Sequence, residues 1–179
     1  MAAPYKHRTP EALAKARNTT LDALADAGMM RRQELHSVFT RHGANRGLID
    51  LTIANMRSEG LITPGRYDSN GYMLSVLGER AIDERKGLDT AKIEHKGMLA
   101  VLSYAAENEG ILGKEMIESP GIGPTRAAFL IRAAFDTAFL AYKMVSRSNP
   151  RGRMTTWGYH ISEQGREHLR KNSAPSTAT

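Results

Sequence analysis

The chain contains no cysteine among its 179 residues. This absence excludes a disulfide framework, a thiolate metal site and a cysteine nucleophile. Long hydrophobic runs are also missing, since no apolar stretch approaches the ~20 residues that a bilayer-spanning helix needs. Residues 1–8 carry no apolar core of the kind found in signal peptides. We therefore expect a cytoplasmic protein that does not enter the membrane.

Familiar catalytic motifs are absent too. The sequence has no Walker loop, no His-Glu-x-x-His and no Gly-x-Ser-x-Gly. Its histidines do not follow the spacing of metal ligands; they are His7, His36, His42, His95, His160 and His168. We expect neither enzymatic activity nor a metal or cofactor, although a catalytic site assembled from distant residues stays open at this point.

Acidic residues are outnumbered. The chain has 25 Lys and Arg against 19 Asp and Glu, a formal net charge of +6 and a pI near 9.7. A basic balance of this kind suits a polyanionic partner. No acidic residue occurs between Asp136 and Glu163.

A short phrase occurs twice in the sequence, 87 residues apart. Residues 71–82 and 158–169 both read Gly-Tyr-x-(Leu/Ile)-Ser-x-x-Gly-x-x-x-(Ile/Leu). A repeat spacing near half the chain length predicts one fold built twice.

The phrase predicts a strand that leads into a short helix. Alternating large and small residues before each serine are typical of a strand. Ser75 and Ser162 are suited to cap the helix that follows, because a serine oxygen accepts from free N–H groups of the first turn. Glycine inside a helix is unfavourable. Its presence at both Gly78 and Gly165 therefore indicates close backbone packing.

The first copy predicts three helices, a hairpin and a final helix. Thr9-Pro10-Glu11 is a helix start, and Gly28 is a C-cap. The predicted segments are helices over 10–28, 31–39 and 46–59, a hairpin over 61–74, and a last helix to about residue 85.

The second copy predicts the same order with a longer hairpin. Its methionines Met98, Met116 and Met144 are expected to fill the core. We expect the tail, residues 172–179, to be disordered and residues 1–8 to form a flexible basic N-terminus. The predicted segments are helices over 90–107, 113–118 and 124–135, and a hairpin over 142–157 with its turn at 148–152.

This order of elements, with Leu-(Ser/Thr)-x-x-Gly leading out of the hairpin, resembles the winged helix-turn-helix of bacterial and archaeal DNA-binding regulators. The resemblance implies a mainly α fold with small β-hairpins (α+β), arranged as two tandem winged helix-turn-helix domains at residues 9–88 and 89–171. It also implies a double-stranded DNA partner.

The third helix of the first copy carries the expected base-reading residues. Arg46 and Arg57 fall on its outward side together with Asp50, and Asn45 precedes it. A recognition helix places such a stripe in the major groove, where arginine grips guanine. We expect Arg46 to read bases, Arg57 to contact phosphate, and Asp50 to accept from cytosine or orient Arg46. The alternative is a solvated face with an i,i+4 ion pair.

The hairpins carry a second set of cations. In the second copy these are Lys143, Arg147, Arg151 and Arg153, and in the first copy Arg66. A basic hairpin suits phosphates or the minor groove. A solvated loop is the alternative.

The third helix of the second copy is less polar. Thr125, Arg126 and Arg132 are its expected DNA contacts, but Phe129 shares a side with Arg126, Arg132 and Asp136. Helices this apolar are usually buried on more than one face. The segment Phe129 to Phe135 is therefore a candidate contact with the first domain or with a second copy in a homodimer. Residues 119–127 also resemble a helix-hairpin-helix, although we favour an ordinary turn between helices.

The sequence thus predicts a DNA-binding protein that acts as a sequence-specific transcriptional regulator. One alternative is a replication or recombination accessory protein of a plasmid or phage. The other is a tandem winged-helix scaffold that binds proteins.

Overall fold

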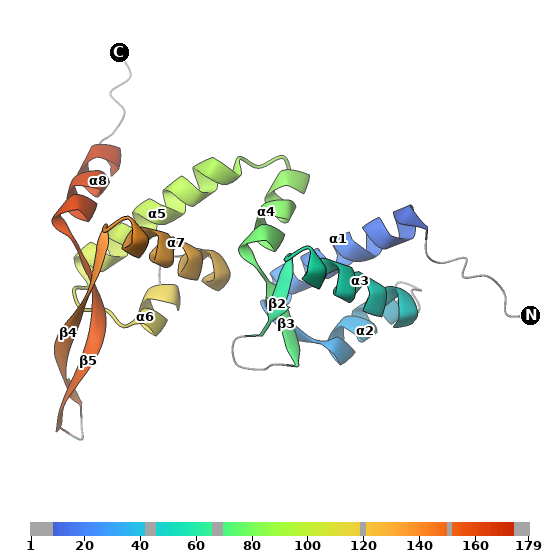
Figure 1. The fold of residues 1–179 in the computed structure, drawn as a ribbon, viewed down its shortest axis with the longest axis horizontal. Helices are drawn as coiled ribbons and strands as arrows, with labels where there is room; N and C mark the ends of the chain where they lie inside the picture. The colour runs from blue at the N-terminus through green and yellow to red at the C-terminus, as the bar shows by residue number, and fades with distance from the viewer. Residues whose placement is uncertain (1–8, 42–45, 66–69, 119–120, 150–151, 174–179) are drawn as a thin grey trace, which may run out of the picture. The chain divides into compact units, whose positions relative to one another are not determined.

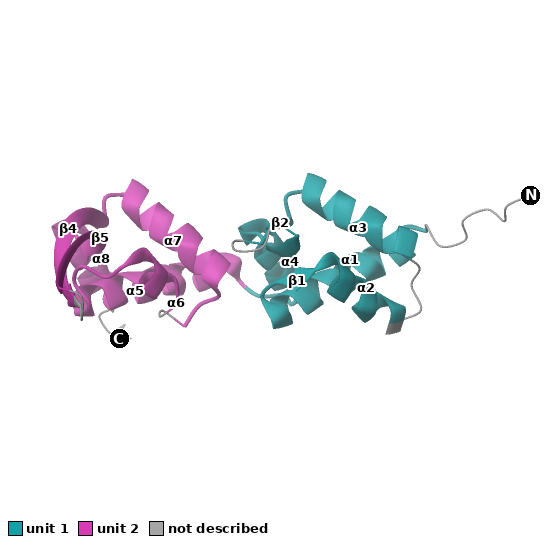
Figure 2. Cartoon of the chain, turned by 90° about the horizontal axis from the view of Figure 1, so that it is seen from below, with its two compact units in different colours: residues 1–88 teal, residues 89–179 magenta. Residues whose placement is uncertain are grey.

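Two separate hydrophobic cores organise the chain. The computed structural model describes residues 9–41, 46–65, 70–118, 121–149 and 152–173. Over these ranges the protein is mainly helical, with small antiparallel sheets, and belongs to the α+β class (Figure 1). It divides into unit 1, residues 1–88, and unit 2, residues 89–179 (Figure 2).

Unit 1 begins with helix α1, Pro10–Ala27. The Thr9 side chain accepts a hydrogen bond from the Ala12 N–H at 3.2 Å and so caps its first turn. Gly28 ends the helix with a φ of 73°, and its N–H donates to the Leu24 carbonyl. Both predicted ends of this helix are confirmed.

The remainder of unit 1 packs two helices and a small sheet against α1. Strand β1 was not predicted, because two residues are too short to show alternation; it pairs with β3 through Met30 and Tyr72. The sheet order is β1-β3-β2. The elements are β1 Met30–Arg31, α2 Arg32–Arg41, α3 Arg46–Ser58, β2 Ile62–Pro64, β3 Gly71–Leu74 and α4 Val76–Arg85.

The core of unit 1 draws on every one of its helices. The largest fully buried side chains include Phe39 of α2 and Met56 of α3. The other main contributors are Leu21, Leu24, Leu35, Ile49, Ile53, Leu61, Leu74 and Ile82.

Unit 2 repeats this order with a longer hairpin, as predicted. An isolated antiparallel bridge joins Ile111 to Tyr159, in the place that β1 and Tyr72 occupy in unit 1. The elements are α5 Thr90–Glu107, α6 Gly113–Glu118, α7 Pro124–Asp136, β4 Leu140–Asn149, β5 Gly152–Ile161 and α8 Glu163–Ser173. In Figure 1 the β4–β5 hairpin extends beyond the helices of its own unit.

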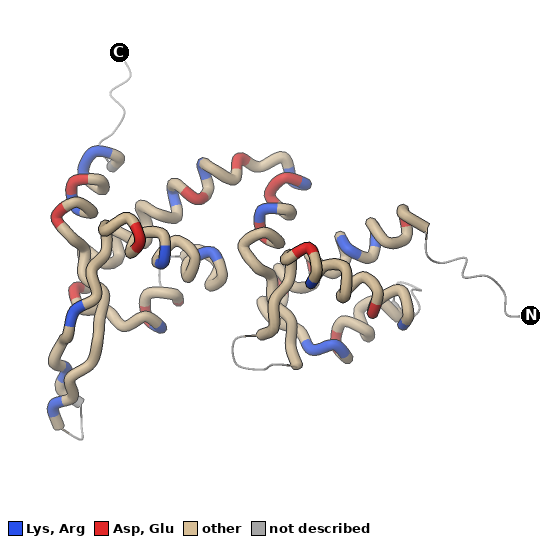
Figure 3. Tube along the Cα trace, viewed as in Figure 1, with Lys and Arg blue, Asp and Glu red and all other residues tan. Residues whose placement is uncertain are grey.

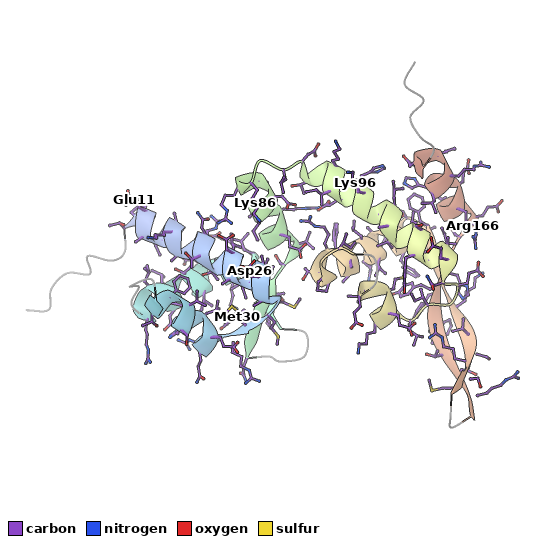
Figure 4. All side chains as sticks on the ribbon, turned by 180° about the vertical axis from the view of Figure 1, so that it is seen from behind. Glu11, Asp26, Met30, Lys86, Lys96 and Arg166 are labelled. Atoms are coloured by element: carbon purple, nitrogen blue, oxygen red, sulfur yellow. The ribbon has the colours of Figure 1, made fainter. Side chains whose placement is uncertain are left out.

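The core of unit 2 is built from α5, α6, α7 and the base of the hairpin. Met116 is fully buried there, as predicted, whereas Met144 is 62% exposed on the hairpin. Arg166 of α8 forms an ion pair with Glu109, just beyond α5 (Figure 4). The buried set includes Val101, Leu102, Ala105, Ile111, Leu130, Ile131, Leu140 and Ile161.

The repeated phrase has one local structure in both units. The Ser75 hydroxyl oxygen accepts from the Gly78 N–H at 3.1 Å, and the Ser162 oxygen accepts from the Gly165 N–H at 3.0 Å. A Cβ on Gly78 would lie 2.2 Å from the Leu61 carbonyl oxygen, and one on Gly165 would lie 2.3 Å from that of Phe139. The predicted caps and close backbone packing are confirmed.

Within the described ranges, no helix combines the length and apolar character that a membrane crossing requires.

Candidate nucleic-acid interface

Helix α3 presents a polar outer stripe, as its sequence predicts. Arg46 and Arg57 are exposed on this stripe, with Ala54 between them. Neither arginine forms an ion pair with any residue that the structure describes. The opposite side of the helix is buried through Leu48, Ile49, Thr52, Ile53 and Met56. Two cations therefore face outward from a helix whose position is fixed by the core.

Asp50 is paired with residues of α2 and not with Arg46. Its carboxylate accepts from Arg32 Nε at 2.9 Å and lies 2.7 Å from Arg32 Nη2, while His36 Nε2 is 3.0 Å from Oδ1. The expectation that Asp50 orients Arg46 is therefore wrong. Asp50 lies on the flank of α3 that faces α2, where both partners reside.

This cluster has electrostatic consequences for Asp50. The hydrogen bond from Arg32 holds the pKa of the Asp50 carboxyl below its ordinary value. Partial burial acts to raise this pKa, and the hydrogen bond from His36 lowers it further. The three side chains join the N-terminal half of α2 to the first turns of α3. The sequence does not reveal Arg32 and His36 as partners, because they are 18 and 14 residues from Asp50.

Helix α7 turns one expected contact residue inward. Arg126 is only 7% exposed, because the phase of α7 buries residues 126, 127, 130, 131 and 134 together. The placement of Arg126 on the outward side is therefore corrected. Thr125 is half-buried.

The outward side of α7 is largely apolar. Phe129 and Phe135 are 37% and 45% exposed there. Arg132 is exposed on the same side, but its Nε lies 2.9 Å from an Asp136 carboxylate oxygen. This stripe is less suited to reading bases than the stripe of α3.

The cationic side chains of the β4–β5 hairpin are of two kinds, exposed ones and one that is ion-paired. Lys143 and Arg153 are exposed, and neither has an ion-pair partner among the described residues. Arg147 instead places Nη1 3.0 Å from Glu115 Oε1 and donates from Nη2 to the Gly110 carbonyl at 3.1 Å. Its expected contact with phosphate is therefore replaced by a structural one, because the side chain reaches back to the loop before α6 and to α6 itself.

The Arg147 contact anchors the hairpin to its own unit. It also lowers the pKa of the Glu115 carboxyl, with help from the Leu112 backbone N–H. Figure 3 shows Lys and Arg positions along the hairpin and no Asp or Glu on it. The hairpin therefore carries an excess of positive charge even with Arg147 neutralised.

Three expected contact residues, Asn45, Arg66 and Arg151, lie outside the described residues, as do the first two positions of the turn at 119–123.

Comparison with protein-family models, with curated proteins and with solved structures found no match to this chain. In the part of the chain that the structure describes, no group of three or more His, Asp or Glu side chains is placed to hold a metal ion. The chemistry available at these surfaces is that of exposed guanidinium and ammonium groups, which bind phosphates and base edges.

Proposed function

We propose that both units are winged helix-turn-helix domains and that the protein binds double-stranded DNA. The support is the order of the elements: α1, β1, α2, α3, β2, β3 and α4 in unit 1. Unit 2 follows the same order, with the bridge at Ile111 in the place of β1. In this arrangement the third helix enters the major groove and the hairpin lies over the backbone.

The observation that carries the proposal is the outer stripe of α3. Arg46 stands in the first turn of the helix and Arg57 in its last, both exposed and free of carboxylate partners within the described ranges. Recognition helices place their N-terminal residues against base edges. Arg46 thus reads guanine, whereas Arg57 contacts the phosphate backbone.

Unit 2 supplies contacts that do not read sequence. Lys143 and Arg153 lie on a hairpin without acidic residues and suit the phosphates or the narrow minor groove. The apolar outer side of α7 suits a protein contact better than bases, since Phe129 and Phe135 flank the ion-paired Arg132.

The biological role that we infer is sequence-specific regulation of transcription. The plasmid or phage replication role differs from it in the arrangement of sites on DNA. Footprinting on the DNA that encodes this protein separates the two roles. A regulator would protect one operator beside a promoter, whereas a replication protein would protect repeated sites near an origin.

The test replaces Arg46 with alanine and compares it with Arg170→Ala, which removes an exposed cation from α8. Because Arg46 is assigned to a base, its loss should cost ~1–3 kcal/mol on the best sequence selected from a random duplex pool. It should also relax the preferred base at one position. Electrophoretic mobility shifts followed by sequencing of the bound pool measure both effects.

The Arg170→Ala variant should retain the native preference and almost the native affinity. An Arg46→Ala protein that selects the same sequence as the native chain would remove Arg46 from the reading role.

A further inference from the structure

One face of the β4–β5 hairpin collects aromatic rings. Tyr142 pairs with Tyr159, and Met144 pairs with Trp157, so these four side chains project from the same side of the two strands. We call them the ring face. Figure 4 shows side chains projecting from both sides of this hairpin.

The rings of this face are ordered against one another; Tyr142 and Trp157 are open to solvent, and Tyr159 is partly buried against the core. Tyr142 stacks on Trp157 with ring centroids 5.5 Å apart and 19° between the planes, and lies 4.9 Å from Tyr159. Tyr142 is 46% exposed and Trp157 50% exposed, beside Met144 at 62%. Large apolar side chains exposed together in this way mark a binding surface.

Both sides of the hairpin attach its base to unit 2. Leu140, Tyr159 and Ile161, on the side of the ring face, pack into or against the core, and Val145 and Arg147 make contacts from the opposite side. Val145 lies against Gly110, and Arg147 reaches Glu115 and the Gly110 carbonyl from the same side. Tyr142, Met144 and Trp157 lie beyond this base and remain exposed.

The surroundings of the ring face carry positive charge and hydroxyl groups. Toward the tip, Ser146 pairs with Thr155, and Ser148 pairs with the exposed Arg153. Arg132 of α7, which is paired with Asp136, is near enough to Tyr159 to oppose the rise that burial causes in the pKa of that phenol. No Asp or Glu occurs between residues 136 and 163.

We propose that the ring face binds single-stranded nucleic acid, with bases stacked on Tyr142 and Trp157 and phosphates drawn along the hydroxyl groups toward Arg153. Aromatic platforms beside cations bind single strands in this way, because every base has a flat π face. A duplex keeps its bases stacked inside and offers none to these rings. This activity therefore goes beyond the proposed binding of double-stranded DNA.

Charge favours this partner over a second copy of the chain. Two hairpins packed ring face to ring face would bring the same cations together without a carboxylate from either hairpin to pair them. A polyphosphate strand neutralises those cations instead.

The test uses Trp157, the single tryptophan of the chain, as its own reporter. Titration of the full-length protein with oligothymidylate should quench its emission in a saturable manner, since a stacked thymine contacts the indole. Tyr142→Ala should weaken this binding about 5- to 100-fold. Met154→Ala, which removes an exposed side chain from the opposite side of the hairpin, should stay within about twofold.

A second variant separates base stacking from general apolar contact. Tyr142→Leu keeps an apolar side chain but loses the ring, so it should lose binding almost as fully as Tyr142→Ala. Native affinity in Tyr142→Leu would overturn the stacking proposal. Trp157 emission that changes with protein concentration alone would show a second copy on the ring face and overturn it as well.

This inference and the duplex proposal fail separately. Arg46→Ala should bind its preferred duplex more weakly, with a relaxed base preference, and should keep the quenching of Trp157 by oligothymidylate. Intact duplex binding without any quench by the single strand would overturn the ring-face inference alone. A quench without duplex binding would support it and contradict the proposal for α3.

Discussion

Gly78 and Gly165 allow the same close approach of two backbone segments in the two units, against the carbonyl groups of Leu61 and Phe139 respectively. Replacing either with alanine would force a Cβ to within 2.2 or 2.3 Å of a carbonyl oxygen that belongs to rigid backbone. We expect each substitution to cost about 1–3 kcal/mol or more in unfolding free energy, since overpacked sites relax poorly. Urea unfolding followed by circular dichroism measures this loss.

Gly113→Ala is the matched control for these variants. A Cβ there meets Tyr159 at 3.5 Å, which is ordinary contact. It should leave stability almost unchanged. Equal stability of Gly165→Ala and Gly113→Ala would contradict the close packing at Gly165.

Ala138 holds a left-handed backbone conformation that usually favours glycine. Its φ is 59°, while Gly60, at the corresponding place in unit 1, has a φ of 70°. Both carbonyls accept the hydroxyl of the repeated serine, from Ser162 and Ser75 respectively. The chain therefore needs this conformation twice but places glycine there only once.

Ala138→Gly should consequently stabilise unit 2, because it removes the strain of the left-handed conformation. The greater freedom of glycine in the unfolded chain offsets part of this gain and leaves a net stabilisation of about 0.5–1 kcal/mol. Trp157 fluorescence during urea unfolding reports on this unit, because the only tryptophan lies in it. A lower unfolding midpoint in Ala138→Gly would show that the alanine is not strained.

At the scale of elements, Asp50 connects α2 to α3. Its folded-state pKa lies below the ordinary value of 3.8 because Arg32 and His36 hydrogen-bond to the charged form. The carboxylate therefore adds stability at pH values above about 4, and this contribution disappears as the pH falls through the lowered pKa.

Asp50→Asn should accordingly be less stable than the native chain at pH 7, and the difference should shrink below about pH 4. Thermal unfolding across this pH range measures it. Glu167→Gln removes an exposed i,i+4 partner of Lys171 on α8 and should change little. A constant gap between native and Asp50→Asn at every pH would show that the charge of Asp50 is not involved.

The helices and hairpins could be predicted because their signals are local. The cap at Thr9, the glycine at Gly28 and the repeated phrase each set a boundary through neighbours in sequence. The apolar phase of α3 likewise predicted that Arg46 and Arg57 face outward.

Two of the errors, at Asp50 and Arg147, come from contacts between distant residues. Asp50 pairs with α2 and Arg147 with Glu115, 32 residues away. Arg126 was predicted to face outward because α7 is apolar on several sides, and its sequence pattern therefore does not indicate which side is buried. The four residues of the ring face alternate along the sequence at 142, 144, 157 and 159. Only the register of the two strands shows that they lie side by side.

At the scale of the whole molecule, each unit has its own core. The two buried clusters share no residue, and each is built from helices and a hairpin of its own unit. The different roles proposed for the two units follow from the side chains that each exposes. Unit 1 presents cations on a helix, whereas unit 2 presents cations and rings on a hairpin.

The most direct measurement is the affinity of the native full-length chain for a random DNA duplex as the salt concentration rises. With about four phosphates contacted, binding should weaken about 100-fold between about 50 and 200 mM salt, because each contact releases condensed counterions. A duplex that stays unbound at the lowest salt, or is held equally well at both concentrations, would contradict the binding of double-stranded DNA.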